Sequence, residues 1–474
     1  MTNATELRKA IIAAHLETSS AGEAPEPATL YIPPSHHKAL RLDAHVVVGA
    51  RGVGKSFWTA ALRSEELRAT LGSTMPELDQ IKVDIGFSEQ EAIHDYPNAD
   101  TFNKLHGDQV DAYDTWRAVI LRWIAKHQDM SVPSDSWSDT VAWLKHSPEA
   151  AANLMQTSRN WRGLIVFDAL DRTSGDWMRM DEIVRGLLRA LLWLRPFPGL
   201  SGKVFLREDQ AERTVFNFPD ASKLVATKTE LAWARHDLHG LLWQRLINAP
   251  EPNGKLLRDI CKAVLQKELY AEDDIWRLPD ELKRETAEQR MVFEKIAGAW
   301  MGTNAKRGVP YTWSVGHLAD GRGQTSPRSF LAAIRQAAED TQERYPDASH
   351  ALHYESIKRG IQKASEIRVA EIAEDYPWVP DVLSVLRGMN VPCEYSAILE
   401  YWQQHYPDGP QGIRLDRLPP QHAERGWDGV RDDLIRIGLI ELRKDGRIDM
   451  PDLYRVGFGL GRKGGVKPKS VLKH

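Results

Sequence analysis

One eight-residue stretch has the composition and spacing of a phosphate-binding loop. Residues 49–56 read G-A-R-G-V-G-K-S, which is the pattern G-x-x-x-x-G-K-S, directly after the apolar run 46–48. Glycines let the backbone curl so that successive N–H groups point at a polyphosphate, and the following helix presents its positive N-terminus to the same anion. Lys55 would reach the β- and γ-phosphates, and the Ser56 hydroxyl would ligate Mg²⁺. The predicted nucleotide contacts of this loop are Gly49, Arg51, Gly52, Val53, Gly54, Lys55, Ser56 and Phe57.

The flanks favour a true phosphate loop over a glycine-rich turn that merely contains Gly-Lys-Ser. An apolar strand-like run precedes the loop, and the helix-compatible residues 57–62 follow it. This is the strand, loop and helix order that the motif requires. The guanine-reading motif Asn-Lys-x-Asp is absent from the sequence, which favours ATP over GTP.

A second apolar run ends in a carboxylate about a hundred residues further along the chain. Residues 163–168 read G-L-I-V-F-D, and a second aspartate follows at position 171. The run predicts a buried parallel strand whose C-terminal end lies at the ligand crevice of such a sheet. Asp168 would hold Mg²⁺ there, and Asp171 would orient or deprotonate the attacking water. The alternative is a buried strand that happens to end in an aspartate.

Residues 167–172, F-D-A-L-D-R, resemble the Walker B segment of the STAND and KAP branches of the AAA+-related P-loop ATPases. In those proteins an aspartate pair at this spacing, often followed by arginine, replaces the adjacent Asp-Glu of ordinary AAA+ proteins. The chain departs from the commonest form at Ala169, where a second aspartate often stands. The resemblance implies ATP hydrolysis and, by analogy alone, a role in bacterial defence against phage or in DNA transactions.

The same resemblance implies that Arg207 senses the γ-phosphate. Residues 202–209 predict another buried strand with a polar end, and in STAND proteins the strand after Walker B commonly ends in an arginine. A guanidinium there could neutralise charge on the phosphoryl oxygens. The alternative is an ordinary surface ion pair of Arg207 with Glu208 or Asp209.

Three more contacts are implied by the AAA+ resemblance. Tyr31 and His36 lie just upstream of the phosphate loop, where many such ATPases cover the adenine, although solvated residues of a proline-fixed loop are an equally good interpretation. Arg328 follows Pro327 at a predicted helix start and resembles the sensor-2 arginine of AAA+ lids, which folds over the nucleotide phosphates.

Composition limits the remaining possibilities. The 474 residues carry a net charge of −4, so no overall positive field attracts nucleic acid, although a local patch can still do so. The sequence shows neither a secretory signal nor a run of about twenty apolar residues, which predicts a cytoplasmic protein without a membrane partner. Its two cysteines, Cys261 and Cys393, lack metal-ligand spacing.

These patterns predict an α/β fold, a parallel-sheet P-loop NTPase core followed by a helical lid and a small winged-helix-like α+β domain. Helices are expected at 4–16, 108–126, 176–194, 382–389, 395–405 and 427–437, and an Asp-Gly hairpin at 439–450. A fifth strand is expected within 224–233. The expected domains are an N-terminal helix with a flexible lead-in (1–29), the ATPase core (30–235), the lid (236–370) and the winged-helix-like domain with a basic tail (371–474).

Two hypotheses of function follow. The first is an Mg²⁺-dependent, ATP-hydrolysing switch or motor, and the second is an adaptor that holds its nucleotide with little turnover and docks DNA or an effector. A small-molecule kinase is disfavoured because the lid and the C-terminal domain offer no evident acceptor pocket. A protein partner or effector chain is expected, a homo-oligomer is compatible with the pattern, and DNA would bind through the basic tail at 462–469. Asp432 and Asp433 of the predicted helix 427–437 would be repelled by a DNA groove, so a protein-contact or intramolecular role of this domain is at least as good an interpretation as DNA binding.

Overall fold

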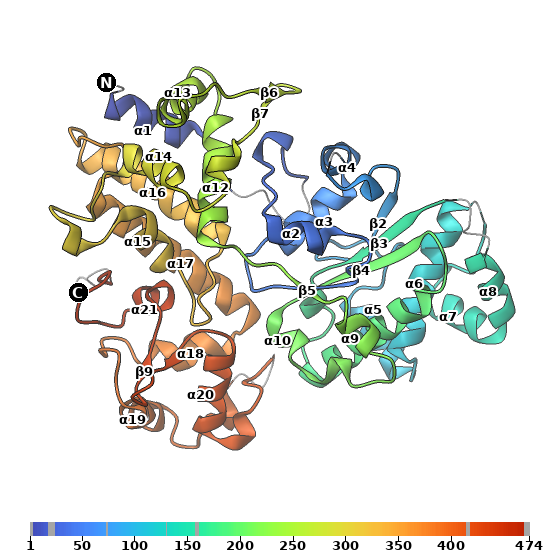
Figure 1. The fold of residues 1–474 in the computed structure, drawn as a ribbon. Helices are drawn as coiled ribbons and strands as arrows, with labels where there is room; N and C mark the ends of the chain where they lie inside the picture. Colours follow the sequence, from blue (N-terminus) through green and yellow to red (C-terminus); the bar gives the residue numbers. More distant parts are fainter. Residues whose placement is uncertain are drawn as a thin grey trace. The chain divides into compact units, whose positions relative to one another are not determined.

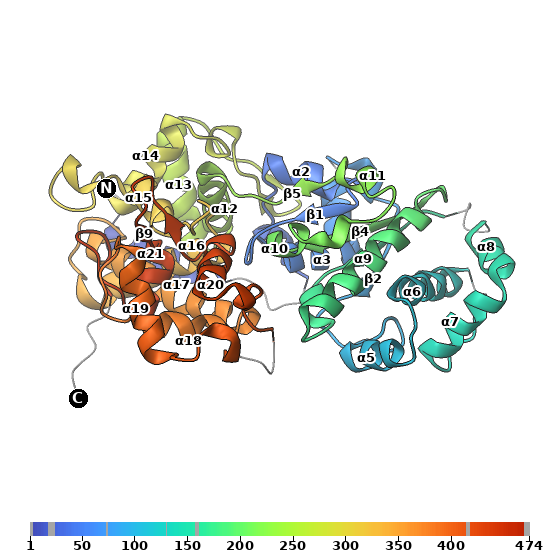
Figure 2. The same ribbon diagram turned by 90° about the horizontal axis from the view of Figure 1, so that it is seen from below.

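The computed structural model describes residues 3–17, 24–72, 74–128, 130–156, 161–413 and 418–468. The chain forms two compact units. We call one the sheet unit (19–27 and 34–232) and the other the helical unit (1–18, 28–33 and 233–474). Their elements are labelled in Figure 1 and seen from below in Figure 2.

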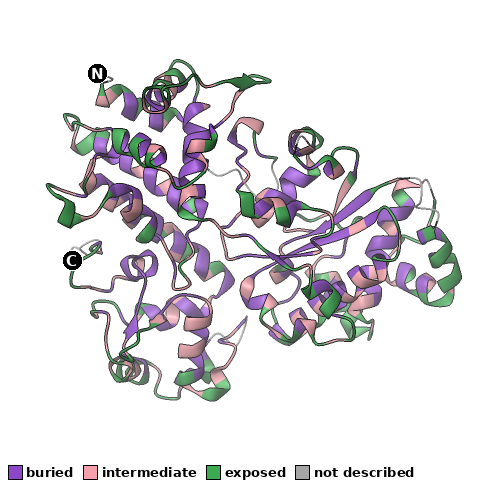
Figure 3. Ribbon diagram, viewed as in Figure 1, coloured by how far each residue is buried: buried purple, intermediate pink, exposed green. Residues whose placement is uncertain are grey.

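The sheet unit is built on five parallel strands in the order β2-β3-β4-β1-β5. The strands are β1 (Val46–Val48), β2 (Lys82–Phe87), β3 (Gly163–Phe167), β4 (Leu200–Leu206) and β5 (Thr229–Glu230). The three central strands are almost wholly buried, as Figure 3 shows in purple, because helices cover both faces of a parallel sheet. All carboxyl ends therefore meet at one edge, and β4 ends between β1 and β3.

Two long helices cover one face of this sheet. Trp123 of α6 (Ala112–His127) lies over Gly163, and Leu191 of α9 (Trp177–Leu194) lies over Gly202. A Cβ on either glycine would come within 2.7 Å of the ring or methyl group above it. Each helix follows an aspartate N-cap whose side chain accepts a backbone N–H. Helix α9 begins within one residue of its predicted start at 176, whereas α6 begins four residues after its predicted start at 108, because Asp111 caps it.

The other helices of the sheet unit are α2 (Pro34–Leu40), α3 (Lys55–Arg63), α4 (Glu65–Gly72), α5 (Ala99–Gly107), α7 (Trp137–His146), α8 (Pro148–Gln156), α10 (Glu208–Ala211) and α11 (Ser222–Val225). The strand expected within 224–233 is shorter than predicted. Its first residues belong to α11, and only Thr229 and Glu230 pair with β1.

The helical unit contains the expected lid. Its elements are α1 (Ala4–Ala13), α12 (Arg235–Ile247), α13 (Asn253–Leu265), the short hairpin β6 (Ala271–Glu272) and β7 (Ile275–Trp276), α14 (Ala287–Ala297), α15 (Pro310–Gly316), α16 (Pro327–Arg344) and α17 (Tyr354–Asp375). The hairpin was not predicted. Helix α17 continues five residues beyond position 370, where the lid was expected to end.

The N-terminal helix packs into this same unit. Its residue Arg8 is 1% exposed and donates hydrogen bonds to the carbonyls of Ala351 (3.2 Å) and Pro346 (3.1 Å). The helix ends at Ala13, three residues earlier than predicted, because Ala14 is extended. Of the predicted lead-in, residues 18–23 lie outside the described part of the chain.

The C-terminal residues form three helices and then a hairpin, the expected order of a winged helix. The elements are α18 (Trp378–Ser384), α19 (Tyr395–His405), α20 (Trp427–Arg436), β8 (Glu441–Leu442), β9 (Ile448–Asp449) and α21 (Asp452–Phe458). Cys393 also pairs with Ile448 of β9 in an isolated antiparallel β-bridge. Helix α18 begins four residues before its predicted start at 382. Among the described residues, no helix combines the length and apolar character needed to cross a bilayer.

Candidate nucleotide-binding site

The loop between β1 and α3 has a backbone that requires its glycines. Gly52 and Gly54 have φ angles of 78° and 103°, in the left-handed region that side chains disfavour. A Cβ on Gly49 would lie 2.7 Å from Val53 Cγ2 and 3.2 Å from Leu231 Cβ. The chain therefore curls tightly before α3 begins at Lys55, as a phosphate loop does.

Lys55 holds this loop closed. Its ammonium donates to the backbone carbonyls of Gly49 (2.9 Å) and Ala50 (2.8 Å). Val53 is buried at 2% exposure, Arg51 is half-buried on the loop, and the Phe57 ring lies edge-on to its neighbour Trp58. The loop residues predicted to contact nucleotide thus surround one turn of backbone at the N-terminus of a nine-residue helix.

The carboxylate of Asp168 meets the Ser56 hydroxyl at the end of β3. The two side chains are neighbours, and Asp168 is only 4% exposed. Burial raises the pKa of Asp168, although the Ser56 hydrogen bond and the nearby charge of Lys55 oppose that rise. Oxygen donors of this kind suit Mg²⁺, so the residues present fit an Mg²⁺-nucleotide.

Asp171 reaches the same edge through an unusual turn. Ala169 adopts a left-handed conformation (φ 55°, ψ 36°), and a single 3₁₀ turn, Leu170–Arg172, follows it. The Asp171 carboxylate then lies 3.5 Å from Arg207 Nη1. Its charge also acts on Asp168 and raises that group's pKa.

Arg207 is buried at the end of β4 instead of lying on the surface. Its guanidinium donates from Nε (3.1 Å) and Nη2 (3.2 Å) to the two carboxylate oxygens of Asp209. Both side chains are less than a tenth exposed. The ion pair that the sequence left as an alternative therefore exists, but it is buried and it faces Asp171.

The two residues expected at the adenine lie in different surroundings. His36 is fully buried, accepts a hydrogen bond from Trp58 Nε1 (3.1 Å) and meets the Ala232 carbonyl through Nε2 (3.2 Å). Tyr31 belongs to the helical unit, where its hydroxyl contacts Asp237 at 3.4 Å. Neither is a solvated loop residue, and the adenine contact stays a prediction for both.

Arg328 also belongs to the helical unit. It occupies the first turn of α16, after Pro327 as predicted, and its Nη1 lies 2.8 Å from a Glu371 carboxylate oxygen. The Arg328 side chain is 45% exposed, whereas Glu371 is largely buried.

The C-terminal helix α20 differs from the expectation in its acidic residues. Asp433 is fully buried, where it accepts the His422 N–H (2.9 Å) and pairs with Arg436 (3.1 Å), so it is not a charge that a DNA groove would meet. Of the predicted basic tail, Arg462 pairs with Asp452 (3.1 Å), and Lys469 lies outside the described residues.

Asp209 is the residue near this site to which the sequence assigned no function. The sequence does contain a signal for it, because Asp209 is an acidic residue two positions after the predicted sensor arginine, at the end of an apolar strand. Spacing alone does not distinguish a buried bidentate clamp from a surface pair.

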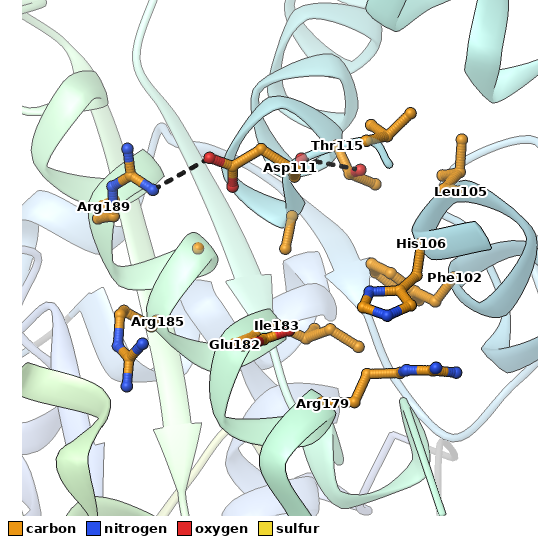
Figure 4. Close-up of a pocket in the computed structure, with 13 residues that line it drawn as sticks. Phe102, Leu105, His106, Asp111, Thr115, Arg179, Glu182, Ile183, Arg185 and Arg189 are labelled. Carbon is orange, nitrogen blue, oxygen red and sulfur yellow. Dashed lines mark hydrogen bonds and ion pairs between the residues drawn. The ribbon is translucent and has the colours of Figure 1, made fainter. Parts of the chain in front are cut away.

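A separate pocket of the sheet unit contains none of the predicted site residues. It has a volume of about 290 Å³ and lies between α5, α6 and α9. Figure 4 shows His106 and Arg179 beside it, and Arg189 paired with Asp111 at 3.3 Å.

No protein-family model matches the chain, and no curated protein matches it. Similar solved structures include the Aeropyrum pernix ORC1 protein in complex with DNA, with 15% identity over 90% of this chain and 91% of that chain at a TM-score of 0.37. Another is the Aeropyrum pernix ORC2 protein in its ADPNP-ADP complexes, with 13% identity over 90% and 93% at a TM-score of 0.42. The assignment of the site stands on the sheet order and the loop geometry of this chain.

Proposed function

We propose that the chain binds ATP with Mg²⁺ and hydrolyses it as a molecular switch or motor. The observation that carries the proposal is the position of the Ser56 hydroxyl of the phosphate loop beside the buried Asp168 carboxylate at the end of β3. It brings together the hydroxyl and the carboxylate that hold Mg²⁺ in P-loop enzymes. When bound, the metal supplies charge neutralisation on the β- and γ-phosphates.

The chain's own residues have separate roles in this proposal. The backbone N–H groups of the loop and the Lys55 ammonium bind the phosphates, and Lys55 exchanges its two carbonyl partners for phosphate oxygens. Asp171 orients or deprotonates the attacking water. Arg207 stabilises charge on the transferred group, and Arg328 reads the phosphates as a sensor-2 arginine.

A nucleotide-held adaptor is the second candidate function. Ala169 favours it, because one of the carboxylates common in related Walker B segments is missing. In this case Asp171 and Arg207 would only distinguish bound nucleotides, and turnover would be negligible. The two candidates share the binding site and differ in the rate of hydrolysis.

From the STAND and KAP resemblance we further propose an AAA+-related ATPase that works with a protein partner or effector chain, in phage defence or in DNA transactions. Homo-oligomerisation is part of this proposal. DNA would contact the hairpin β8–β9 and the basic tail, since the acidic Asp432 of α20 is already occupied by Arg425 and Arg431.

Steady-state hydrolysis tests the proposal. Wild type should hydrolyse ATP in the presence of Mg²⁺, Lys55→Ala should lose binding and turnover, and Asp171→Asn should lose turnover while still binding ATP. The exposed ion pair of α11 provides matched controls, Lys223→Ala and Asp220→Asn, which should behave as wild type. Tight binding without turnover in wild type would favour the adaptor, and absence of binding would refute both. The same assay with double-stranded DNA tests the DNA proposal.

A further inference from the structure

We infer that Asp209 is a positioning residue that holds Arg207 in the orientation that reads the γ-phosphate. The inference rests on the proposed ATP site and adds to it a residue that makes no contact with nucleotide. Of Arg207 and Asp209, only Arg207 can bind a phosphate, because the Asp209 carboxylate is negatively charged like the phosphate.

The contacts of Arg207 fix its guanidinium on two sides. Asp209 accepts hydrogen bonds from Nε and Nη2 of Arg207 in a bidentate pair. The remaining nitrogen, Nη1, lies 3.5 Å from Oδ2 of Asp171. The Arg207 backbone N–H is fixed as well, by the Gln210 side-chain oxygen at 3.1 Å. A planar fork held along one edge has little freedom to rotate.

Burial makes this arrangement depend on Asp209. Arg207 and Asp209 are 7% and 5% exposed, and a buried guanidinium requires a carboxylate partner. Without the Asp209 charge, Asp171 would remain as a carboxylate partner of Arg207, 3.5 Å from Nη1. The guanidinium would then turn away from the phosphate and pair with Asp171, which is the proposed general base.

The strand order explains why this orientation matters. Because β4 lies between β1 and β3, Arg207 leaves the sheet between the phosphate loop and the Asp168 strand. A cation fixed there meets the last phosphate of ATP, which ADP lacks. Asp209 should therefore contribute to the preference for ATP over ADP, a quantity that does not depend on turnover.

The test measures two dissociation constants by calorimetry, for a non-hydrolysable ATP analogue and for ADP, each with Mg²⁺. In Asp209→Asn the ratio of the two affinities should fall about three- to tenfold from the wild-type preference for the ATP analogue, whereas ADP affinity should change by less than about twofold. Asp114→Asn is the matched control. It removes a carboxylate whose side chain is 13% exposed and which pairs with Lys145 at 3.2 Å in the same unit, and it should leave the ratio unchanged.

A double-mutant cycle separates orientation from stability. Arg207→Lys retains the charge but cannot form the bidentate pair, so adding Asp209→Asn to it should change the ratio little further. An unchanged ratio in folded Asp209→Asn, additive effects in the cycle, or a wild type that does not distinguish the two nucleotides would overturn the inference. Absence of hydrolysis in wild type would refute only the catalytic proposal, because the ratio is a binding measurement.

Discussion

Protonation of His36 should weaken the sheet unit when the pH falls from 7 to 5. The ring is fully buried and accepts a hydrogen bond from Trp58 Nε1 at Nδ1, so its proton is on Nε2, which faces the Ala232 carbonyl. Protonation at Nδ1 would break the Trp58 bond and bury a charge. Burial accordingly lowers the pKa of His36 to about 4 from 6.5.

The magnitude follows from this difference in pKa. Between pH 6.5 and pH 4 the unfolded chain binds a proton at His36 that the folded chain does not, so stability is present above this window and is lost as the pH falls through it. Linkage between a folded pKa of about 4 and an unfolded pKa of 6.5 gives a loss of about 2 kcal/mol from pH 7 to pH 5.

The assay is amide hydrogen exchange of α3 in increasing urea, measured at both pH values, because it reports the opening free energy of this unit alone. His36→Gln can donate and accept but does not titrate. It should lose about 2 kcal/mol less than wild type between pH 7 and pH 5. The control His106→Gln changes an exposed histidine and should follow wild type. Equal losses in wild type and His36→Gln would refute the reasoning.

Three further outcomes are expected. Gly49→Ala places a methyl group against Val53 and Leu231, so it should lower the thermal stability by about 1–3 kcal/mol and weaken binding of the ATP analogue in calorimetry. Arg8→Met leaves the carbonyls of Ala351 and Pro346 without their donor and should cost about 1–3 kcal/mol in urea denaturation, with faster hydrogen exchange in α1. Chelation of Mg²⁺ should reduce affinity for the ATP analogue without changing the melting temperature of the nucleotide-free protein, and an unchanged affinity would contradict the assignment of Ser56 and Asp168.

The α/β fold could be predicted because its signals are local. Apolar runs that end in polar residues identify parallel strands, and the carboxyl ends of such strands meet at one edge. Lys55, Ser56, Asp168, Asp171 and Arg207 were therefore expected at the same edge, and the structure brings these five together there. Their roles towards nucleotide stay predictions.

Other features depend on contacts between distant segments, which periodicity does not encode. Nothing near Arg8 indicates that it bonds to carbonyls more than three hundred positions away. Asp433 was expected where a DNA groove would repel it, but it is buried and is satisfied by the His422 N–H and by Arg436. The β6–β7 hairpin was missed because its strands have only two residues each and its turn, Asp273-Asp274, lacks the Asp-Gly pair that indicated the β8–β9 hairpin.

The left-handed Ala169 bears on the choice between hydrolysis and a held nucleotide. A residue with a Cβ in this conformation costs about 1–2 kcal/mol, and the sequence has alanine there instead of glycine or asparagine. Strain of this size persists where the surrounding structure enforces it, and it gathers at functional sites. Here the turn places the Asp171 carboxylate 3.5 Å from Arg207 Nη1 and near Ser56 and Asp168. A chain that held nucleotide without distinguishing ATP from ADP would need Ser56, Asp168 and the loop but not this turn. The strained Ala169 therefore supports a role of Asp171 and Arg207 towards the γ-phosphate, which hydrolysis requires and which a held nucleotide requires only if the chain distinguishes ATP from ADP.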